Sequence, residues 1–475
     1  MEYGFLSILP PLLAVILAII TKETLISLLS GVILGNFILK HGSFIPALKK
    51  TLDDLLVQIN GNTSVVVFSF LVGAIIILIQ VSGGVRGFVI FLTEKSKLVK
   101  NRRHALFLTV FLGIAMFFES SINILVSGTV TKPLTDKYKV SREELAYVCD
   151  SVAAPVCGIV PFNGWGATLM ALIGVQVTAG VISGNPASLL IKSIPFNFYS
   201  ILSFISVCFY IITNKHWGPM KKAVIRAKTT GKLLADGAVP LIDEEGHHSA
   251  ILHGVKPCLW NMLIPLLVVV GMMPVGLYIT GHGNMLAGSG STSVYWAVVA
   301  SLVVTAIYYI LIKRIISGKV YIQYLYKGIG SMVPMIVLLL LGFMIGSIGS
   351  ELGTGKYLAS LIEGNLHGAY GPAIIFILSG FIAFSTGTSW GTFALMLPIG
   401  LQMAVAIDAN ISVTIGAVIS GALMGDHCSP ISDTTILASM ATASDHIDHV
   451  KTQLPYALLN GFFATILYLI AGYFL

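Results

Sequence analysis

Long apolar segments are the feature of this sequence that most constrains its fold. Each is long enough, or nearly long enough, to cross the ~30 Å hydrocarbon core of a lipid bilayer. That core offers no water to backbone N–H and C=O groups, so a crossing segment satisfies them internally as a helix. The sequence therefore predicts an all-α polytopic membrane protein. Its apolar segments lie at about 5–20, 24–39, 65–81, 193–213, 259–280, 292–312, 333–350 and 452–475.

Composition excludes most other classes of protein. Of the 475 residues, 56% are hydrophobic and only 10% are charged, against about 25% charged in soluble domains. This excludes a soluble enzyme, a disordered chain and a disulfide-rich scaffold. The five cysteines form no CxxC pair, so no disulfide or metal framework is indicated. We assign the net charge of +7 to cytoplasmic loops, which collect Lys and Arg, and expect no nucleic-acid partner.

The sequence contains an internal repeat. A shift of 269 residues aligns roughly 40–170 with 309–440, largely without gaps, and places Ser120 on Ser389. In both copies, apolar segments alternate in the same order with stretches that polar residues, Gly and Pro interrupt. Two copies of one membrane unit are typical of secondary transporters. The interrupted stretches lie at about 104–135, 143–182, 371–407 and 411–443.

This repeat predicts three parts: a first transmembrane repeat over 1–213, a linker over 214–258 and a second repeat over 259–475. We expect about five transmembrane helices in each repeat, plus one re-entrant hairpin with short arms at 104–131 and 373–405. With the linker inside, the inner segments hold 23 of the 28 Lys and Arg residues, as the positive-inside rule requires. An odd number of crossings makes the repeats inverted, with broken helices at the midplane, where such transporters bind their substrates.

The predicted hairpins have polar apices. Hydroxyl and amide side chains beside Gly offer oxygen ligands, which hard cations prefer, and Na⁺ is such a cation. The alternative is that these Ser and Thr residues only cap the helical arms. The candidate ion-binding residues are Glu119, Ser120 and Asn123 in the first apex and Thr388, Ser389 and Thr392 in the second.

The other pair of interruptions carries more chemistry. In the first half, Asn163 follows Pro161 and is the candidate ligand. In the second half, Pro430 removes a backbone donor and interrupts the helix. An ionisable side chain inside a membrane is costly and is a functional hypothesis by default. Asp433 is also placed to cap the next helix. The second-half candidates are Asp426, Ser429, Ser432, Asp433 and Thr434.

Two acids of the first half, Glu119 and Asp150, are candidate proton-coupling sites, and either of them could instead face water at an interface. A carboxylate holds Na⁺ or H⁺ but holds both poorly, so a carboxylate that visits both membrane faces exchanges the two ions. No cofactor is required. The run Asp-His-Ile-Asp-His at 445–449 favours a helix cap over a metal site. We expect Na⁺ at Asp426, Ser429, Asp433, Ser120 and Ser389.

Three motifs resemble the NhaC family of Na⁺/H⁺ antiporters: Gly-Asp-His-Cys-Ser-Pro-Ile-Ser-Asp-Thr-Thr at 425–435, Asp-His-Ile-Asp-His-Val at 445–450 and the Phe-Glu-Ser-Ser apex at 118–121. The resemblance covers most of the chain. It implies inverted repeats with two hairpins and two unwound helices, a homodimer, and a transport domain that moves against a scaffold of the early spans. Relatives of that family include malate/lactate exchangers and proteins associated with amino-acid uptake, so the resemblance leaves the substrate open.

We therefore predict a Na⁺(Li⁺)/H⁺ antiporter of the inner membrane that works by elevator-like alternating access. The inferred site is rich in carboxylates and lacks Lys and Arg, whereas an organic anion would usually need a cationic clamp. The main alternative is a Na⁺-coupled amino-acid or organic-acid transporter of the same fold, because an amino acid brings its own ammonium group. An ion channel is a further alternative. No nucleophile paired with a base is legible, so we predict no enzyme activity.

Overall fold

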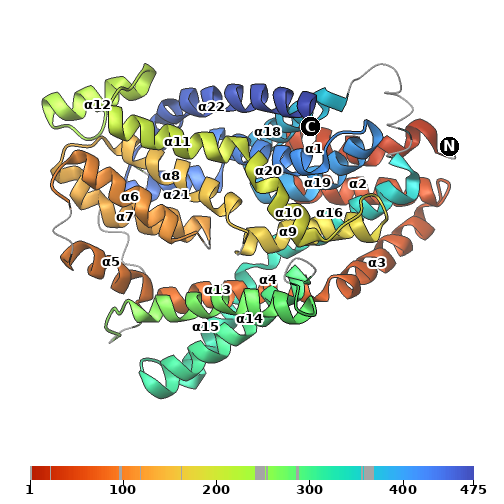
Figure 1. Ribbon diagram of the computed structural model, residues 1–475, viewed down its shortest axis with the longest axis horizontal. Helices are drawn as coiled ribbons and strands as arrows, with labels where there is room; N and C mark the ends of the chain where they lie inside the picture. Colours follow the sequence, from red (N-terminus) through yellow and green to blue (C-terminus); the bar gives the residue numbers. More distant parts are fainter. Residues whose placement is uncertain are drawn as a thin grey trace.

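The computed structural model is a bundle of helices (Figure 1). In the part of the chain that it describes, no β-strand forms, and eight helices are long and apolar enough to cross a membrane, or up to ten if each of two bent pairs is one span. The prediction of an all-α polytopic membrane protein is confirmed. The residues described are 3–21, 23–95, 99–117, 119–161, 163–240, 252, 255–284, 288–354, 357 and 368–475.

The helices follow one another along the chain in two series. The first series comprises α1 (Leu9–Thr21), α2 (Thr24–Leu39), α3 (Phe44–Gly61), α4 (Thr63–Val81), α5 (Gly84–Lys95), α6 (Arg102–Ala115), α7 (Ser120–Lys137), α8 (Arg142–Ile159), α9 (Gly164–Thr178), α10 (Pro186–Ser193) and α11 (Phe198–Thr213). A connecting helix, α12, spans Gly218–Thr230. The second series comprises α13 (Trp260–Thr280), α14 (Gly290–Ala306), α15 (Gly318–Ser331), α16 (Val333–Leu352), α18 (Gly371–Thr386), α19 (Ser389–Ala406), α20 (Ile411–Cys428), α21 (Asp433–Thr442) and α22 (His446–Phe474).

Helix starts recur with the spacing of the sequence repeat. Four helices of the first series and four of the second begin 269 residues apart. The hairpins and the interrupted helices are therefore one structural unit that is built twice. The paired starts are 102 and 371 for α6 and α18, 120 and 389 for α7 and α19, 142 and 411 for α8 and α20, and 164 and 433 for α9 and α21.

All eight predicted apolar segments correspond to helices, but helices also form in segments for which loops were predicted, namely α3, α5, α10 and α15. The two longest of these, α3 and α15, are amphipathic. Charged residues such as Lys50 and Asp53 interrupt the apolar run of α3, so a search for uncharged runs passes over it. α3 meets α4 at a bend of 67° and exposes Ile45 and Leu52 on its outer side.

Both predicted hairpins are present as packed helix pairs, α6 with α7 and α18 with α19. The arms of the second hairpin are not short, as we had expected, because each of them has the length and hydropathy of a membrane span. Its apex turns at Gly387, whose φ of +67° lies in the left-handed region that favours glycine. A Cβ at this position would collide with the backbone of Ile431. The apex therefore lies directly on the stretch between α20 and α21.

The hairpin of each half packs against the interrupted helices of the other half. α21 lies against α7 and α8, and α9 lies against α19. The ring of Trp165 in α9 meets Trp390 and Phe393 of α19, with ring centroids 5.1 and 5.6 Å apart. On the other side of the molecule, α4 and α13 pack with α14, and α15 packs with α4; these helices form the lower edge of Figure 1, opposite α22.

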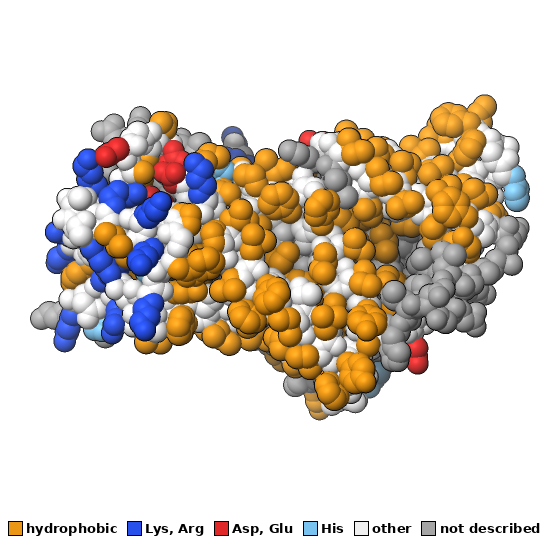
Figure 2. Space-filling model, turned by 90° about the horizontal axis from the view of Figure 1, so that it is seen from above, with side chains coloured by type: hydrophobic (Ala, Val, Ile, Leu, Met, Phe, Trp, Pro, Cys, Tyr) orange, Lys and Arg blue, Asp and Glu red, His pale blue; other side chains and the backbone are white. Residues whose placement is uncertain are grey.

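The surface separates apolar from basic regions. Hydrophobic side chains cover most of the face seen in Figure 2, and Lys and Arg gather at the end that carries α12. The long helices α13 and α22 run along the axis that joins this end to the opposite one (Figure 1). Apolar flanks and one basic end suit a molecule whose helices cross a bilayer. The chain is a multi-pass membrane protein.

The helix α12 is a structured part of the predicted linker. Its buried residues pack against α8 and α22. Arg226 of α12 forms an ion pair with Glu143 of α8 at 2.8 Å, and the N–H of Val239 donates to Asp445 Oδ2 at 2.9 Å. This part of the linker therefore lies on the interrupted helices. The acidic run at 243–245, with the rest of 241–251, lies outside the described residues.

Candidate functional site

The stretch between α20 and α21 forms the centre of the site. The helix stops at 429–432 because Pro430 has no backbone N–H with which to continue it. The Oγ of Ser429 donates to a backbone carbonyl of α18 at 2.7 Å. Further upstream, α20 lies so close to α18 that a Cβ on Gly425 would collide with the backbone of Gly380. The interrupted stretch is thus held against the second hairpin.

Asp426 is the buried carboxylate of this stretch and is 1% exposed. The Oγ of Ser432 donates to Asp426 Oδ1 at 2.6 Å, and the backbone N–H of Ser389 donates to Oδ2 at 3.3 Å. Ser389 is the first residue of α19, so the positive end of that helix dipole faces the carboxylate. Among the described residues, no Lys, Arg or His forms an ion pair with Asp426.

Asp433 is exposed, whereas Ser432 and Thr434 on either side of it are buried. Its Oδ1 accepts the N–H of Thr434 at 2.8 Å. The expectation that Asp433 caps α21 is wrong, because Ser432 is the cap and accepts the N–H groups of Thr434 and Thr435. Ser432 also binds Asp426. The hydroxyl of Ser432 therefore links the buried carboxylate of Asp426 to the start of α21, where the exposed carboxylate of Asp433 lies.

The equivalent stretch of the first half has the same construction without carboxylates. Asn163 caps α9 by accepting the N–H of Gly166 at 2.9 Å. Its Nδ2 donates to the carbonyls of Phe117 and Cys157, both at 2.8 Å. Asn163 thus ties the first hairpin to the end of α8, and both ends of its amide are already used.

The remaining hairpin residues have structural contacts. Thr388 caps α19, and Thr392 Oγ1 donates to the carbonyl of Thr388 at 2.9 Å. Asn123 Nδ2 donates to the carbonyl of Gly113 at 2.7 Å, which ties α7 to α6, while the buried Asn123 Oδ1 has no partner in the described part of the chain. Thr388 therefore caps its helical arm, as the alternative for the hairpin hydroxyls predicted, whereas the cap formed by Asn163 was not predicted.

The structure brings together only part of the predicted ion-binding set. Asp426, Ser429, Asp433 and Ser389 lie on or against the α20–α21 stretch. Ser120 is buried at the start of α7, directly after the half-buried Glu119. Within the described residues, no hydrogen bond joins Ser120 or Asn123 to Asp426 or Asp433.

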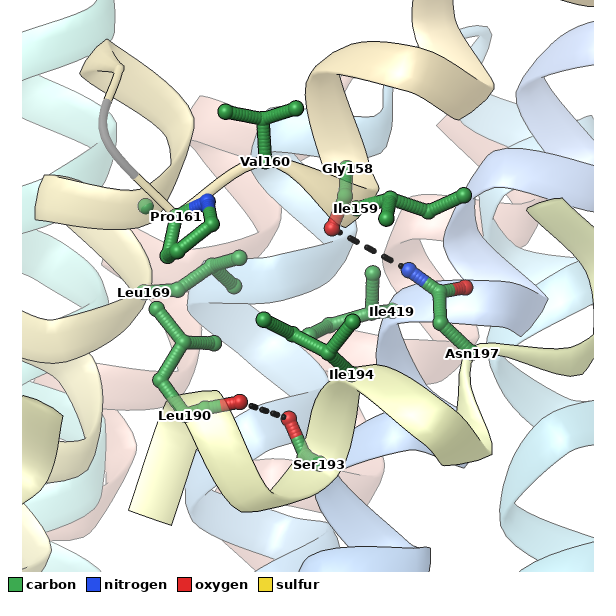
Figure 3. A pocket seen from close by; sticks show the side chains of 11 residues that line it. Gly158, Ile159, Val160, Pro161, Leu169, Leu190, Ser193, Ile194, Asn197 and Ile419 are labelled. Atoms are coloured by element: carbon green, nitrogen blue, oxygen red, sulfur yellow. Dashed lines mark hydrogen bonds between the residues drawn. The ribbon is translucent and has the colours of Figure 1, made fainter. Parts of the chain in front are cut away.

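Cavities of different size lie beside the interrupted helices. The cavity in Figure 3, at the end of α8, has a volume of ≈ 10 Å³, about the space that one water needs. Asn197 lines it and donates to the carbonyl of Gly158 at 3.1 Å. A second cavity of ≈ 50 Å³ separates Phe117 and Asn163 from apolar side chains of α4, α13 and α14. A third, of ≈ 430 Å³, is lined by polar side chains that include Asn60, Asn62, Thr63, Asn185, Ser289 and Thr292.

A second buried carboxylate, Asp150, lies among α8, α21 and α22 and is 0% exposed. Its Oδ2 accepts hydrogen bonds from Gln453 Nε2 at 2.7 Å and from Thr435 Oγ1 at 3.3 Å. The ring nitrogen Nε2 of His449 lies 3.5 Å from the same oxygen. Asp150 therefore does not face an interface. Sequence reasoning missed Gln453 and His449 as its neighbours, although their spacing of four residues places both on one face of α22.

Charged residues near the helix ends have partners of their own. Glu144 of α8 pairs with Arg102 and with His216. Asp445 caps α22 by accepting the N–H of Asp448 at 3.0 Å, as predicted. Burial works against ionisation of Asp445, but the N–H groups of Asp448 and of Val239 outweigh it and hold the pKa of Asp445 below its usual value.

Buried carboxylates beside helix breaks, inside an apolar helical bundle built twice, define a polytopic membrane transporter. Residues 156–473 match the Na⁺/H⁺ antiporter family. The chain belongs to that family, and the resemblance to Na⁺/H⁺ antiporters that its motifs carry is confirmed.

Similar proteins include other antiporters. One similar protein, described as uncharacterized, comes from Haemophilus influenzae (strain ATCC 51907 / DSM 11121 / KW20 / Rd). It is 35% identical over an alignment of 489 residues, gaps included, which covers 98% of this chain and 91% of that protein. An uncharacterized Na⁺/H⁺ antiporter of the same strain is 31% identical over 146 residues, 30% of each chain. The arginine/ornithine antiporter ArcD of Halobacterium salinarum (strain ATCC 700922 / JCM 11081 / NRC-1) is 37% identical over 99 residues, 20% of each chain.

The fold is also shared with a solved structure. The crystal structure of the Alcanivorax borkumensis YdaH transporter matches with a TM-score of 0.60 over 89% of this chain and 88% of that chain, at 14% sequence identity. At that identity the match concerns the fold alone. It places the arrangement of helices in Figure 1 among known transporter folds.

Proposed function

We propose that this protein is a Na⁺(Li⁺)/H⁺ antiporter. The observation that carries the proposal is the carboxylate of Asp426, which is 1% exposed and is bound by a hydroxyl and a backbone N–H, without a cationic partner among the described residues. A buried carboxylate is costly as a bare anion. It becomes neutral when it is protonated and is compensated when it binds a cation. An exchanger alternates between these two states.

The proposed Na⁺ site uses the oxygens of the interrupted stretch. The carboxylates of Asp426 and Asp433 and the hydroxyl of Ser429 belong to it, and the hairpin apices contribute Ser389 and Ser120. When the cation reaches Asp426, the hydroxyl of Ser432 can turn from that carboxylate to Thr434 Oγ1, which lies 3.0 Å away. The ion thereby replaces a hydrogen bond to the carboxylate, and its release allows that bond to return.

Exchange requires the site to face each side of the membrane in turn. We place the basic end of the molecule (Figure 2) in the cytoplasm and the protein in the inner membrane, on the positive-inside rule. The hairpins and interrupted helices move as one elevator-like transport domain against α4, α13 and α14 within a homodimer. The ≈ 430 Å³ cavity lies between these two groups of helices. Asn185 and Gly288 line this cavity, and the 3.0 Å hydrogen bond from Asn185 Nδ2 to the carbonyl of Gly288 must open during the movement.

Proteoliposomes with an internal pH dye test this proposal. A gradient of Na⁺ or Li⁺, but not of K⁺, is expected to drive proton movement through the wild-type protein. The Asp433→Asn variant is expected to fold and to lose this exchange, because it lacks the exposed carboxylate that receives the ion.

The matched control is Asp408→Asn. Asp408 is exposed beyond the end of α19, at a φ of +53° that Asn also tolerates, so this variant should exchange ions as the wild type does. Persistent exchange in Asp433→Asn contradicts the proposed site. A silent dye with folded wild-type protein contradicts the proposed function.

A second candidate function is Na⁺-coupled transport of an amino acid or organic acid. The ≈ 50 Å³ cavity favours it, because apolar side chains there face Asn163 and Phe117, and organic ligands bind in pockets that combine an apolar wall with a few polar groups. The ammonium group of an amino acid would pair with Asp426 or Asp433. Uptake of a radiolabelled amino acid that depends on Na⁺, together with a silent pH dye, would establish this function in place of Na⁺/H⁺ exchange.

A further inference from the structure

Asp150 and His449 are buried ionisable residues that the proposed Na⁺ site does not use. Both are 0% exposed. The 3.5 Å between His449 Nε2 and Asp150 Oδ2 is an ion-pair distance and is long for a hydrogen bond. Among the described residues, neither ring nitrogen of His449 has a hydrogen-bond partner, and neither does Asp150 Oδ1. Unpaired polar atoms in a protein interior are costly, which points to a ligand that satisfies them.

Gln453 joins this pair to the neighbourhood of the Na⁺ site. It lies one helical turn beyond His449 on α22 and donates to Asp150 Oδ2 at 2.7 Å and to the carbonyl of His427 at 2.6 Å. His427 is the residue directly after Asp426. The Asp150–His449 pair is therefore separate from the Asp426 carboxylate, yet a single amide side chain connects the two.

Other titratable groups face Asp150 from the helices packed around it. The ring of His427 lies 3.9 Å from Asp150 Oδ2, but its two nitrogens are already hydrogen-bonded to the hydroxyls of Tyr199, at 2.6 Å, and Ser151, at 2.9 Å. His449 is therefore the neighbouring base whose nitrogens remain available in the described part of the chain. The groups that interact electrostatically with Asp150 are Cys149 of α8, Asp426, His427 and Cys428 of α20, Asp433 of α21, Tyr199 of α11 and His449 of α22.

We infer that Asp150 and His449 form a proton-binding site, distinct from the Na⁺ site at Asp426 and Asp433, and that this pair carries the exchanged proton. The inference rests on the proposed Na⁺/H⁺ exchange and assigns the exchanged proton to this pair instead of to the Asp426 carboxylate, which then serves the cation. With the proton bound, an imidazolium lies beside a carboxylate and the pair is neutral overall. Without the proton, Asp150 remains as a buried negative charge.

Electrostatic repulsion couples the two sites. Na⁺ between Asp426 and Asp433 adds a positive charge near the imidazolium in a medium of low dielectric constant, where like charges repel strongly. The proton therefore leaves His449 as Na⁺ binds, and the net charge of the helices stays constant because one positive charge replaces another. The negative charge of Asp150, which the imidazolium no longer balances, in turn attracts the Na⁺.

Proton release on Na⁺ binding tests the inference in the purified full-length protein. A pH dye in weakly buffered detergent solution measures released protons, calorimetry measures bound Na⁺, and choline chloride controls for ionic strength. Wild-type protein is expected to release about one proton per Na⁺ bound. His449→Gln is expected to bind Na⁺ but to release at least roughly fivefold fewer protons, with an Na⁺ affinity that no longer varies with pH.

Two further variants make the result decisive. His104→Gln replaces an exposed histidine at the start of α6 and should release protons as the wild type does. Asp150→Asn/His449→Gln replaces the pair by two amides and buries no charge, so it provides the test if His449→Gln does not fold. Unchanged proton release in either pair variant overturns the inference and returns the proton to Asp426 and Asp433. Wild-type protein that binds no Na⁺ overturns the proposed function itself.

Discussion

The interrupted stretches of the two halves are built alike. Under the 269-residue shift, Pro161 corresponds to Pro430 and Asn163 corresponds to Ser432. Asn163 and Ser432 each cap the helix that follows, and each also bonds outside its cap, Asn163 to two carbonyls and Ser432 to the Asp426 carboxylate. Both halves thus break a helix inside the bundle with the same three features. These are a proline, an N-cap residue and a further hydrogen bond from that residue to a group outside the capped helix.

The same two stretches differ in charge. The positions of Asp426 and Asp433 are occupied in the first half by Cys157 and Gly164. The break itself is therefore a property of the repeated fold, whereas the carboxylates are an addition to one copy. Some residues therefore shape the site and others give it a charge. Substitutions in the two groups should differ in their effects on transport and on stability.

The largest expected effect comes from the charged position and its uncharged counterpart. Asp426→Asn keeps the shape of the side chain but removes the charge that binds the cation, so Na⁺-driven proton flux should fall by about 100-fold, equivalent to roughly 2.7 kcal/mol. Cys157→Ser changes the equivalent position and should leave the flux within about twofold of wild type. Flux in proteoliposomes, normalised to inserted protein, measures both. Equal losses in the two variants would show that the halves share the ion-binding role.

A smaller effect is expected at the two caps. Ser432→Ala removes a cap, worth about 1 kcal/mol, and a hydrogen bond to a carboxylate, worth about 1.5–3 kcal/mol. The Na⁺ concentration for half-maximal flux should therefore change by roughly tenfold, and thermal stability should fall.

Asn163→Ala should lower thermal stability at least as much, because it leaves the carbonyls of Phe117 and Cys157 unpaired, yet change the half-maximal Na⁺ concentration less than about twofold. Unfolding followed by a thiol-independent dye and flux at varied Na⁺ measure the two quantities. A large Na⁺ effect in Asn163→Ala would make Asn163 the ion ligand that its position in the sequence first indicated.

Features with a local signal could be predicted from the sequence. Uncharged apolar length identified the spans, and Gly, Pro and hydroxyl residues identified the hairpin apices and the break at Pro430. The amphipathic helices α3 and α15 were missed because their helical character lies in the spacing of apolar residues, which charges such as Lys50 interrupt. The cap of α21 was assigned to Asp433 instead of Ser432, since both residue types cap helices and they are adjacent.

The surroundings of Asp150 could not be predicted, because they have no local signal. Thr435, His449 and Gln453 reach it from helices that begin almost 300 residues later in the chain. A sequence read alone places His449 in a motif near a helix start, where a cap is the natural interpretation. Only the packing of α22 and α21 on α8 turns it into the neighbour of a buried acid.

The smallest expected effect sharpens the comparison of caps. Ser432 caps α21 with a hydroxyl that does not titrate, whereas Asp445 caps α22 with a carboxylate whose pKa is held below its usual value by backbone N–H groups, against the effect of burial. A carboxyl whose pKa is lower in the folded state stabilises the protein above its unfolded pKa, and this contribution is lost as the pH falls through the folded pKa. Asp445→Asn keeps a good cap and should weaken the acid-induced fall in melting temperature by a small amount, whereas Asn163→Ala, which removes an uncharged cap bonded only to backbone groups, should lower the melting temperature equally at every pH. Melting curves in detergent from neutral to acid pH distinguish the two, and an unaltered acid profile in Asp445→Asn would show that its charge does not stabilise the start of α22.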